Sequence, residues 1–227
     1  MAIALAQTVH KTRVNYSGTT TAAITPTAGS LLVSVEAVFS TTIAEHTLAD
    51  SKTNGWAVAN AASGDADSHV IIRYAMNVAG GATTLTWSET GAGSMDVEAD
   101  ILEFTGIALT LALDVAVDAT DTSAEPAVSS GTLAQADEVI VAIASHTGAD
   151  TTWAVDAAGV LISENEDNDN GQTYSSQHQI VAATTSEAME WTLGASRTWF
   201  ATLASFKAVA AGGISIPVVY HHRQRNF

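Results

Sequence analysis

Hydrophobic and polar positions alternate in the segment 95–102, where the carboxylates Asp96, Glu98 and Asp100 are separated by single apolar residues. Successive side chains of a β-strand point to opposite faces of its sheet. The alternation therefore predicts a half-buried strand in an antiparallel sheet, with an acidic outer face that keeps the protein in solution. A cation site or a catalytic pair of carboxylates is the alternative interpretation of the three acids.

Two further segments, residues 30–39 and 138–144, are rich in β-branched and apolar residues and predict strong strands that match one another. Clusters of turn-forming residues separate the predicted strands. Residues 50–55 form one such cluster, which ends in Asn-Gly and predicts a hairpin before Trp56. Since no long window has a period of 3.6 residues, the predicted fold class is all-β, an antiparallel, jelly-roll-like β-sandwich.

Aromatic landmarks recur in the same order in the two halves of the chain. They form three pairs, Trp56 with Trp153, Trp87 with Trp191, and Phe104 with Phe206. The recurrence predicts that the sandwich is built from two duplicated halves. The repeated tryptophans are expected in the core of both halves rather than on an exposed face.

These patterns divide the chain into three parts. Residues 1–28 are predicted to be an N-terminal strand or arm, and residues 29–209 the β-sandwich. The two halves of the sandwich are expected at about residues 29–118 and 129–209. Residues 210–227 are predicted to be an extended C-terminal docking arm.

The C-terminal segment departs from the pattern of strands and turns. A frayed terminus is ordinarily polar, whereas this one is apolar and then basic after a Gly-Gly linker. It predicts either a final edge strand on its own sheet or an arm that adds to a neighbouring subunit. For the arm, the expected docking residues are Ile216, Pro217, Val218, Val219, Tyr220, His221, His222, Arg223, Arg225 and Phe227.

The charge balance is acidic, since 24 Asp and Glu oppose 8 Lys and Arg, which gives a formal net charge of −16. All the acidic residues lie between Glu36 and Glu190, so both ends of the chain are mildly basic. A negative surface repels phosphate backbones, and nucleic acid is therefore not an expected partner. The basic ends are suited to dock on an acidic surface like that of the body.

The chain has no Cys, which excludes disulfides, thiol nucleophiles and zinc held by cysteine. The first residues do not have the pattern of a signal peptide, because no basic residue precedes their short apolar run. No apolar run is long enough to predict a membrane span. We expect a protein that is made in the cytoplasm and has no membrane partner.

Candidates for chemistry are few. Residues 166–171 are similar to the start of a calcium loop, but Gln177 stands where the bidentate acid belongs, and a turn rich in Asn, Asp and Gly explains them. The best acid–base pairs are His146 with Asp150 and His69 with Asp67. Neither pair has a nucleophile in a recognisable context. No catalytic, cofactor-binding or metal-binding residue is assigned, and no cofactor is expected.

Four short motifs follow one another in the first half. They are residues 29–33 (Gly-Ser-Leu-Leu-Val), 49–56 (Ala-Asp-Ser leading to Gly-Trp), 74–81 (Tyr-Ala-Met-Asn-Val-Ala-Gly-Gly) and 103–106 (Glu-Phe-Thr-Gly). In this order they resemble a β-sandwich module that is common in the structural genes of tailed bacteriophages and also occurs in some bacterial surface proteins. The resemblance covers about residues 29–208, and the apolar and basic ending is similar to the tails of small phage virion proteins. It implies a virion component and carries no catalytic residues.

We therefore expect a structural bacteriophage virion protein and not an enzyme. The expected role is that of a capsid decoration (cement) protein, which binds the particle surface through its termini and gains avidity from repetition over a lattice. Its partners would be other virion subunits and further copies of itself in a homo-oligomer. The alternatives are a tail or fibre accessory protein, or an adhesin-like carbohydrate-binding module that uses exposed tryptophans and has a glycan as partner. A glycosidase would need two carboxylates across a cleft.

Overall fold

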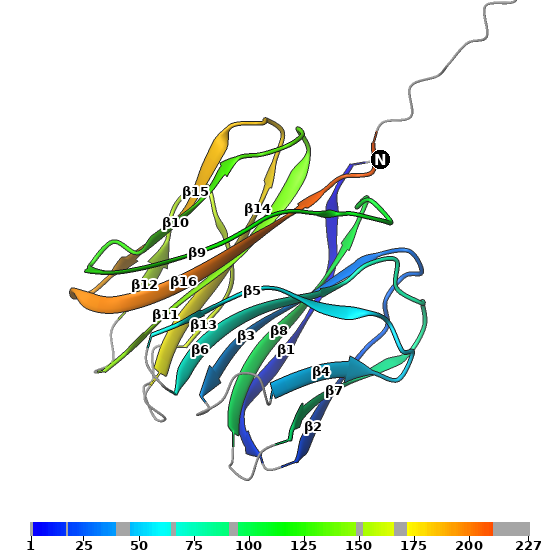
Figure 1. Cartoon of the computed structure of the whole chain (residues 1–227), viewed down its shortest axis with the longest axis horizontal. Helices are drawn as coiled ribbons and strands as arrows, with labels where there is room; N and C mark the ends of the chain where they lie inside the picture. Colours follow the sequence, from blue (N-terminus) through cyan, green and yellow to red (C-terminus); the bar gives the residue numbers. More distant parts are fainter. Residues whose placement is uncertain are drawn as a thin grey trace, which may run out of the picture.

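The structure is a computed structural model. It describes residues 2–16, 18–39, 46–64, 67–90, 95–148, 152–165 and 172–210. These residues form sixteen strands and no helix (Figure 1). Since every strand pairing is antiparallel, the predicted all-β, antiparallel fold class is confirmed.

The first half of the chain forms two sheets. In spatial order, the five-stranded sheet consists of β1 (Ala4–Tyr16), β8 (Met95–Thr105), β3 (Leu31–Phe39), β6 (Ser68–Ala75) and β5 (Trp56–Ser63). The three-stranded sheet consists of β2 (Thr19–Ile24), β7 (Thr83–Glu89) and β4 (His46–Asp50).

The second half also forms a large and a small sheet. In spatial order, the five-stranded sheet consists of β13 (Val160–Asn165), β14 (Gln172–Val181), β11 (Glu138–Thr147), β16 (Arg197–Lys207) and β9 (Leu113–Ser123). The three-stranded sheet consists of β10 (Ala127–Thr132), β15 (Ser186–Leu193) and β12 (Trp153–Val155). When each strand number of the first half is raised by eight, the strand orders of the second half result. The two halves thus share one topology, while a duplication of the sequence stays a prediction.

The shared topology shows which of the three aromatic pairs lie on corresponding strands. Two pairs lie on corresponding strands, Trp87 with Trp191 and Phe104 with Phe206. The third pairing was wrong, because Trp56 begins β5, the counterpart of β13, whereas Trp153 begins β12, the counterpart of β4. β5 and β13 begin at residues 56 and 160, which are 104 positions apart, whereas the two tryptophans are 97 apart.

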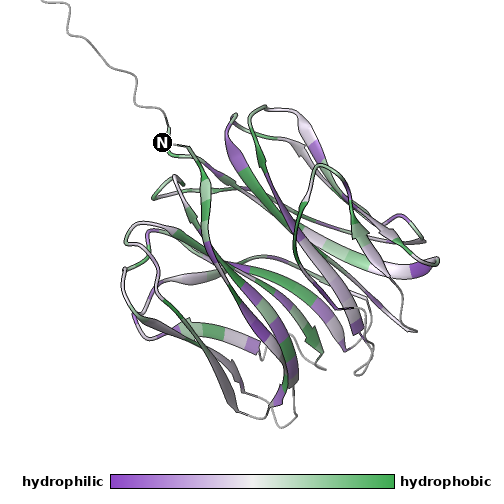
Figure 2. Ribbon diagram, turned by 180° about the vertical axis from the view of Figure 1, so that it is seen from behind, coloured by the Kyte–Doolittle hydropathy of each residue, from purple (hydrophilic) through white to green (hydrophobic). Residues whose placement is uncertain are grey.

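The large and small sheets of each half pack face to face as a β-sandwich, and the two large sheets pack against each other (Figure 1). The molecule therefore has four layers, and three clusters of buried apolar residues fill the spaces between them. β3 and β11 are buried on both faces, which explains their nearly continuous runs of hydrophobic residues (Figure 2). The sequence predicted a sandwich, but not that each half forms one.

The central packing overturns the prediction for β8. Val97 and Ile101 pack in the core of the first sandwich, so the alternation was correct. The prediction of an acidic outer face was wrong, because Asp96, Glu98 and Asp100 are all buried. Side chains of β13 cover this face and donate hydrogen bonds to two of the carboxylates.

Strand pairing also shows to which sandwich the segments near the predicted domain boundaries belong. β1 and β2, which lie within residues 1–28, pair with β8 and β7 and so belong to the sheets of the first sandwich. β9 begins before residue 118 and pairs with β16 of the second sandwich. Residues 50–55 form the predicted turn, but the predicted hairpin was wrong, because the turn joins β4 to β5 in a different sheet.

Candidate functional sites

The first and last described residues meet at one end of the molecule, which we call the terminal pole (Figure 1). It consists of residues 2–3, 27–30, 105–111 and 208–210. Val209 N donates a hydrogen bond to Gly106 O at 2.8 Å, and Ile107 forms a β-bridge with Ala208. Gly106 has a φ of +79°, and a Cβ atom at this position would lie 2.3 Å from the carbonyl oxygen of Ala2. The segment around Gly106 therefore holds both ends of the described chain.

An open hollow of about 410 Å³ lies at the terminal pole. It is lined by Thr27, Ala28, Gly29, Ser30, Thr105, Gly106, Ile107, Leu109 and Val209. The lining side chains are small or apolar and none is charged, so the hollow is suited to receive apolar side chains. Its walls come from three segments that are far apart in the sequence.

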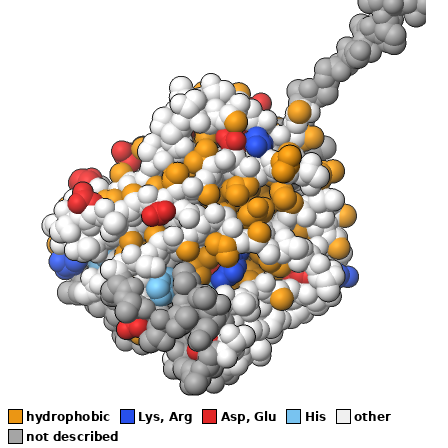
Figure 3. All heavy atoms as spheres, viewed as in Figure 1, with side chains coloured by type: hydrophobic (Ala, Val, Ile, Leu, Met, Phe, Trp, Pro, Cys, Tyr) orange, Lys and Arg blue, Asp and Glu red, His pale blue; other side chains and the backbone are white. Residues whose placement is uncertain are grey.

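Two leucines at the terminal pole are exposed to solvent. Leu109, which lines the hollow, is 50% exposed, and Leu111 is 81% exposed. Leu111 also has a φ of 51°, a left-handed conformation that costs a bulky residue about 1–2 kcal/mol. Hydrophobic side chains gather from the middle of the visible face up to the pole where β16 ends (Figure 3). A strained backbone that presents an apolar side chain to water indicates a contact surface.

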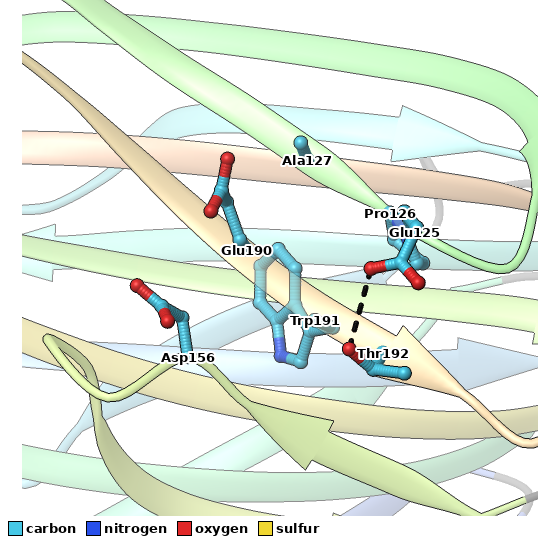
Figure 4. A pocket seen from close by; sticks show the side chains of 7 residues that line it. All are labelled: Glu125, Pro126, Ala127, Asp156, Glu190, Trp191 and Thr192. Atoms are coloured by element: carbon cyan, nitrogen blue, oxygen red, sulfur yellow. Dashed lines mark hydrogen bonds between the residues drawn. The ribbon is translucent and has the colours of Figure 1, made fainter.

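A second hollow, of about 250 Å³, opens on the small sheet of the second half (Figure 4). Three carboxylates surround it, those of Glu125, Asp156 and Glu190, and Thr192 Oγ1 donates a hydrogen bond to Glu125 at 3.3 Å. Pro126, Ala127 and Trp191 complete its lining. Among the described residues, no group of three or more His, Asp or Glu side chains is arranged to hold a metal ion. The three carboxylates make the hollow chemically suited to accept hydrogen bonds from hydroxyl or amine groups.

The tryptophans are mostly internal. Trp87, Trp153, Trp191 and Trp199 are buried, while Trp56 is half-buried and donates a hydrogen bond to the Asp50 carboxylate. The expected core position of the repeated tryptophans is therefore confirmed for Trp87, Trp153 and Trp191, while Trp56 packs against the core and stays partly exposed. A row of exposed rings, which a sugar-stacking face would use, is not found among them.

A buried ion cluster surrounds Glu36 in the core of the first sandwich. His46 Nε2 lies 2.7 Å and Arg73 Nε lies 3.3 Å from Glu36 Oε2. Ser34 Oγ and Trp87 Nε1 donate to Glu36 Oε1 at 2.6 and 3.2 Å. Burial by itself would raise the pKa of Glu36, but the charges and hydrogen bonds of His46 and Arg73 outweigh it and lower the pKa to about 2. The cluster connects four strands from both sheets of the sandwich.

A second polar cluster lies between the two large sheets, where β1 and β8 face β13. Asp100 Oδ1 lies 2.9 Å from His10 Nδ1, and Ser163 Oγ donates to the other carboxylate oxygen of Asp100. Glu98 Oε1 lies 3.4 Å from His10 Nε2, and Asn165 Nδ2 donates to Glu98 Oε2 at 2.9 Å. Burial raises the pKa of Asp100, despite the hydrogen bonds from Ser163 and His10.

This second polar cluster contains the residue types of a hydrolase triad, but in a different order. A catalytic serine needs the imidazole as its immediate base, whereas here Ser163 and His10 both contact Asp100. The Tyr174 hydroxyl lies 3.3 Å from Ser163 Oγ. Its pKa is raised by burial and by the charge of Glu98, so this hydroxyl remains protonated. The arrangement joins the two halves through polar contacts and does not activate a nucleophile.

The two histidines of the predicted acid–base pairs have structural contacts. His146 stacks on Trp153 with ring centroids 5.4 Å apart, and its Nε2 lies 2.7 Å from Thr173 Oγ1. His69 Nδ1 lies 2.7 Å from Ser63 Oγ. Both histidines are buried, so these contacts help to hold neighbouring strands together.

Several predicted features lie outside the described residues. They are Asp150, which was paired with His146, the calcium-like turn at residues 166–171, and the docking residues at 216–223, 225 and 227. The prediction that this C-terminal segment docks on a partner therefore stays a prediction.

Comparisons of the chain with protein-family models, with curated proteins and with solved structures found no match. The described residues also contain no helix long and apolar enough to cross a membrane. The resemblance to phage structural modules stays a prediction.

Proposed function

We propose that the chain is a structural component of a bacteriophage virion that docks through its terminal pole, with capsid decoration as its role. The observation that carries this proposal is that both ends of the described chain meet beside an apolar hollow with exposed leucines. A protein tied to a particle through its termini needs a contact surface where its chain enters and leaves. A tail or fibre accessory protein would use the same pole and is the alternative position.

The buried polar clusters support a structural role. The carboxylates of Glu36 and Asp100 form their hydrogen bonds inside the molecule, where they join strands and sheets. Outside these clusters the chain is strongly acidic, with a formal net charge of −16 for the whole protein. Such a surface keeps copies on a particle soluble and prevents them from binding nucleic acid.

A glycan-binding module is the candidate from another class. The acidic hollow favours it, because the carboxylates of Glu125, Asp156 and Glu190 could accept hydrogen bonds from sugar hydroxyls. The buried tryptophans count against it. A glycan array in which Glu190→Gln abolishes binding would favour this candidate over the virion role.

The proposal is tested on particles of the phage whose genome encodes the chain. Mass spectrometry of purified particles should find the protein in a fixed copy number. A chain that ends at Ala210 should be missing from them, although its β-type circular dichroism persists because all sixteen strands end before residue 208. Particles without the full-length chain would refute the virion role, and incorporation of the truncated chain would refute docking through the C-terminal segment.

A further inference from the structure

We propose that the hollow at the terminal pole receives the apolar C-terminal segment, residues 214–220, of a second copy of this chain. The inference rests on the proposed function and deepens it, because it names the first partner that the pole binds. Each copy would carry both a hollow and a segment that fits the hollow of another copy.

The receiving surface is built from described residues. The hollow of about 410 Å³ has no charged side chain in its lining, and Leu109 at its rim is half-exposed. Leu111 is more exposed still and has a left-handed backbone. Exposed apolar side chains around an apolar hollow are typical of surfaces that become covered on binding.

The residues that follow Val209 in the sequence indicate which segment fills the hollow. Val209 lines the hollow, and only Ala210 follows it among the described residues, so seventeen residues continue from this point. Every second residue of the segment 214–220 is large and apolar, namely Ile214, Ile216, Val218 and Tyr220. Since side chains alternate along an extended chain, these four would share one face. That face matches the apolar lining in chemistry.

The position of the segment favours binding to the hollow of a second copy over binding to the hollow of the same copy. Residues 210–213 would have to reverse the chain at once to bring residues 214–220 back over Val209. In a pair of copies that face each other pole to pole, each segment reaches the partner's hollow without a reversal. Such an exchange fills both hollows and closes with two-fold symmetry.

Charge supports the same exchange. Residues 211–227 contain two basic residues, Arg223 and Arg225, and no acidic residue. The remaining residues 1–210 hold all 24 acidic residues and the other six of the eight basic ones. The basic end of one copy is therefore attracted to the acidic body of the other, and this attraction should weaken with salt.

The test compares the full-length chain with two matched variants. Leu109→Asp places a charge at the hollow, and Val160→Asp places one at a residue of similar exposure on β13, at the opposite edge of its sheet from β9. Light scattering over a concentration series should show a dimer for the parent and Val160→Asp, and a monomer for Leu109→Asp. The same β-type circular dichroism spectrum for the three proteins would show that all are folded, whereas their melting temperatures should differ because dimerisation stabilises the native state.

A synthetic peptide of residues 211–227 provides the second measurement. Added to the full-length dimer, it should compete for the hollow and convert the dimer to monomers. Its affinity for Leu109→Asp should be at least about tenfold weaker than for Val160→Asp, as expected for a central apolar contact. A parent that is a monomer, a dimer that Leu109→Asp leaves intact, or a peptide that binds both variants equally would overturn the inference.

These outcomes are separable from those of the proposed function. If particles contain the chain but the peptide does not bind the hollow, the exchange between copies is wrong and the virion role stands. If the peptide binds and the dimer forms but particles lack the chain, the virion role is wrong, while the exchange stands.

Discussion

Glu36 is enclosed in the core of the first sandwich, where an isolated carboxylate would be neutral because burial disfavours its charge. Its partners His46 and Arg73 reverse this effect and keep it ionised. At the corresponding position of β11 the second sandwich has no carboxylate. Leu31 on β3 and Val139 on β11 occupy corresponding positions, because each pairs with a phenylalanine, Phe104 and Phe206 respectively. Five residues further along the strand, β3 has Glu36 whereas β11 has Ala144. One topology is thus compatible with a carboxylate at this core position in one half and with alanine in the other.

The lowered pKa of Glu36 makes stability depend on pH. Ionised Glu36 stabilises the fold above its usual pKa of 4.5, and this contribution is lost as the pH falls toward about 2. We expect Glu36→Gln to lower the free energy of unfolding by about 3–5 kcal/mol at neutral pH, because Arg73 loses its buried partner. In urea unfolding experiments the difference from the parent should shrink as the pH is lowered. Equal stability at neutral pH would show that the cluster is not held by charge.

Glu138 should have the opposite pH dependence. Burial and the neighbouring carboxylate of Asp114 raise its pKa above 4.5. Its ionisation therefore destabilises the fold, so its favourable contribution is complete below pH 4.5 and is lost as the pH rises through the raised pKa. Glu138→Gln should match the parent under acidic conditions and be at least as stable as the parent at neutral pH. A variant less stable than the parent at neutral pH would contradict this assignment.

The turn after β8 holds the terminal pole together, and Gly106 is the residue that permits it. Gly106→Ala would add a Cβ atom 2.3 Å from the Ala2 carbonyl oxygen to the strain of a φ of +79°. Gly81→Ala is a matched control, because Gly81 has a φ of +90° and nothing within 4 Å of such an atom. Both variants should lose about 1 kcal/mol through backbone strain. Gly106→Ala should lose clearly more in thermal unfolding, and equal losses would mean that the N-terminal residues move aside freely.

The strands β5 and β12 each begin with a tryptophan, and the sequence pattern predicted that these two residues occupy corresponding positions in the two halves. Trp153 is buried, so Trp153→Ala should cost about 3–5 kcal/mol. Trp56 is half-buried and contributes one hydrogen bond to Asp50, and Trp56→Ala should cost about 1–2 kcal/mol. Urea unfolding of the two variants measures the difference. Equal losses would restore the equivalence of the two positions.

The sequence predicted the strands better than it predicted which other elements pack against each strand. Period two in residues 95–102 and the apolar run of β3 identified strands correctly, because these patterns are local. Whether the carboxylates of β8 face water depends on a second sandwich that lies far along the chain, and alternation alone contains no information about it. The hollow at the terminal pole was not predicted either, because residues 27–30, 105–109 and 209 are far apart in the sequence and come together only in the folded chain. Leu109 lies in the loop between β8 and β9, which begins at Leu113.

At the scale of the whole molecule, the two sandwiches share their largest apolar cluster. The central cluster takes buried residues from both large sheets, including Val33 and Leu102 from the first half and Val141 and Phe206 from the second. Neither half can expose its large sheet without opening this cluster to water. The polar contacts of Glu98 and Asp100 with β13 join the same two sheets. We therefore expect the two sandwiches to unfold as one cooperative unit.

Phe206→Ala tests this cooperativity. Phe206 is fully buried in the central cluster, and its loss should lower the free energy of unfolding by about 3–5 kcal/mol. Trp87 and Trp191 lie in the cores of the first and the second sandwich, so each reports on one half. In fluorine NMR of fluorotryptophan-labelled protein, both signals should shift to the same lower urea midpoint, although the substitution is in the second half. A Trp87 signal that keeps its midpoint while the Trp191 signal shifts would show that the sandwiches unfold independently across the central core.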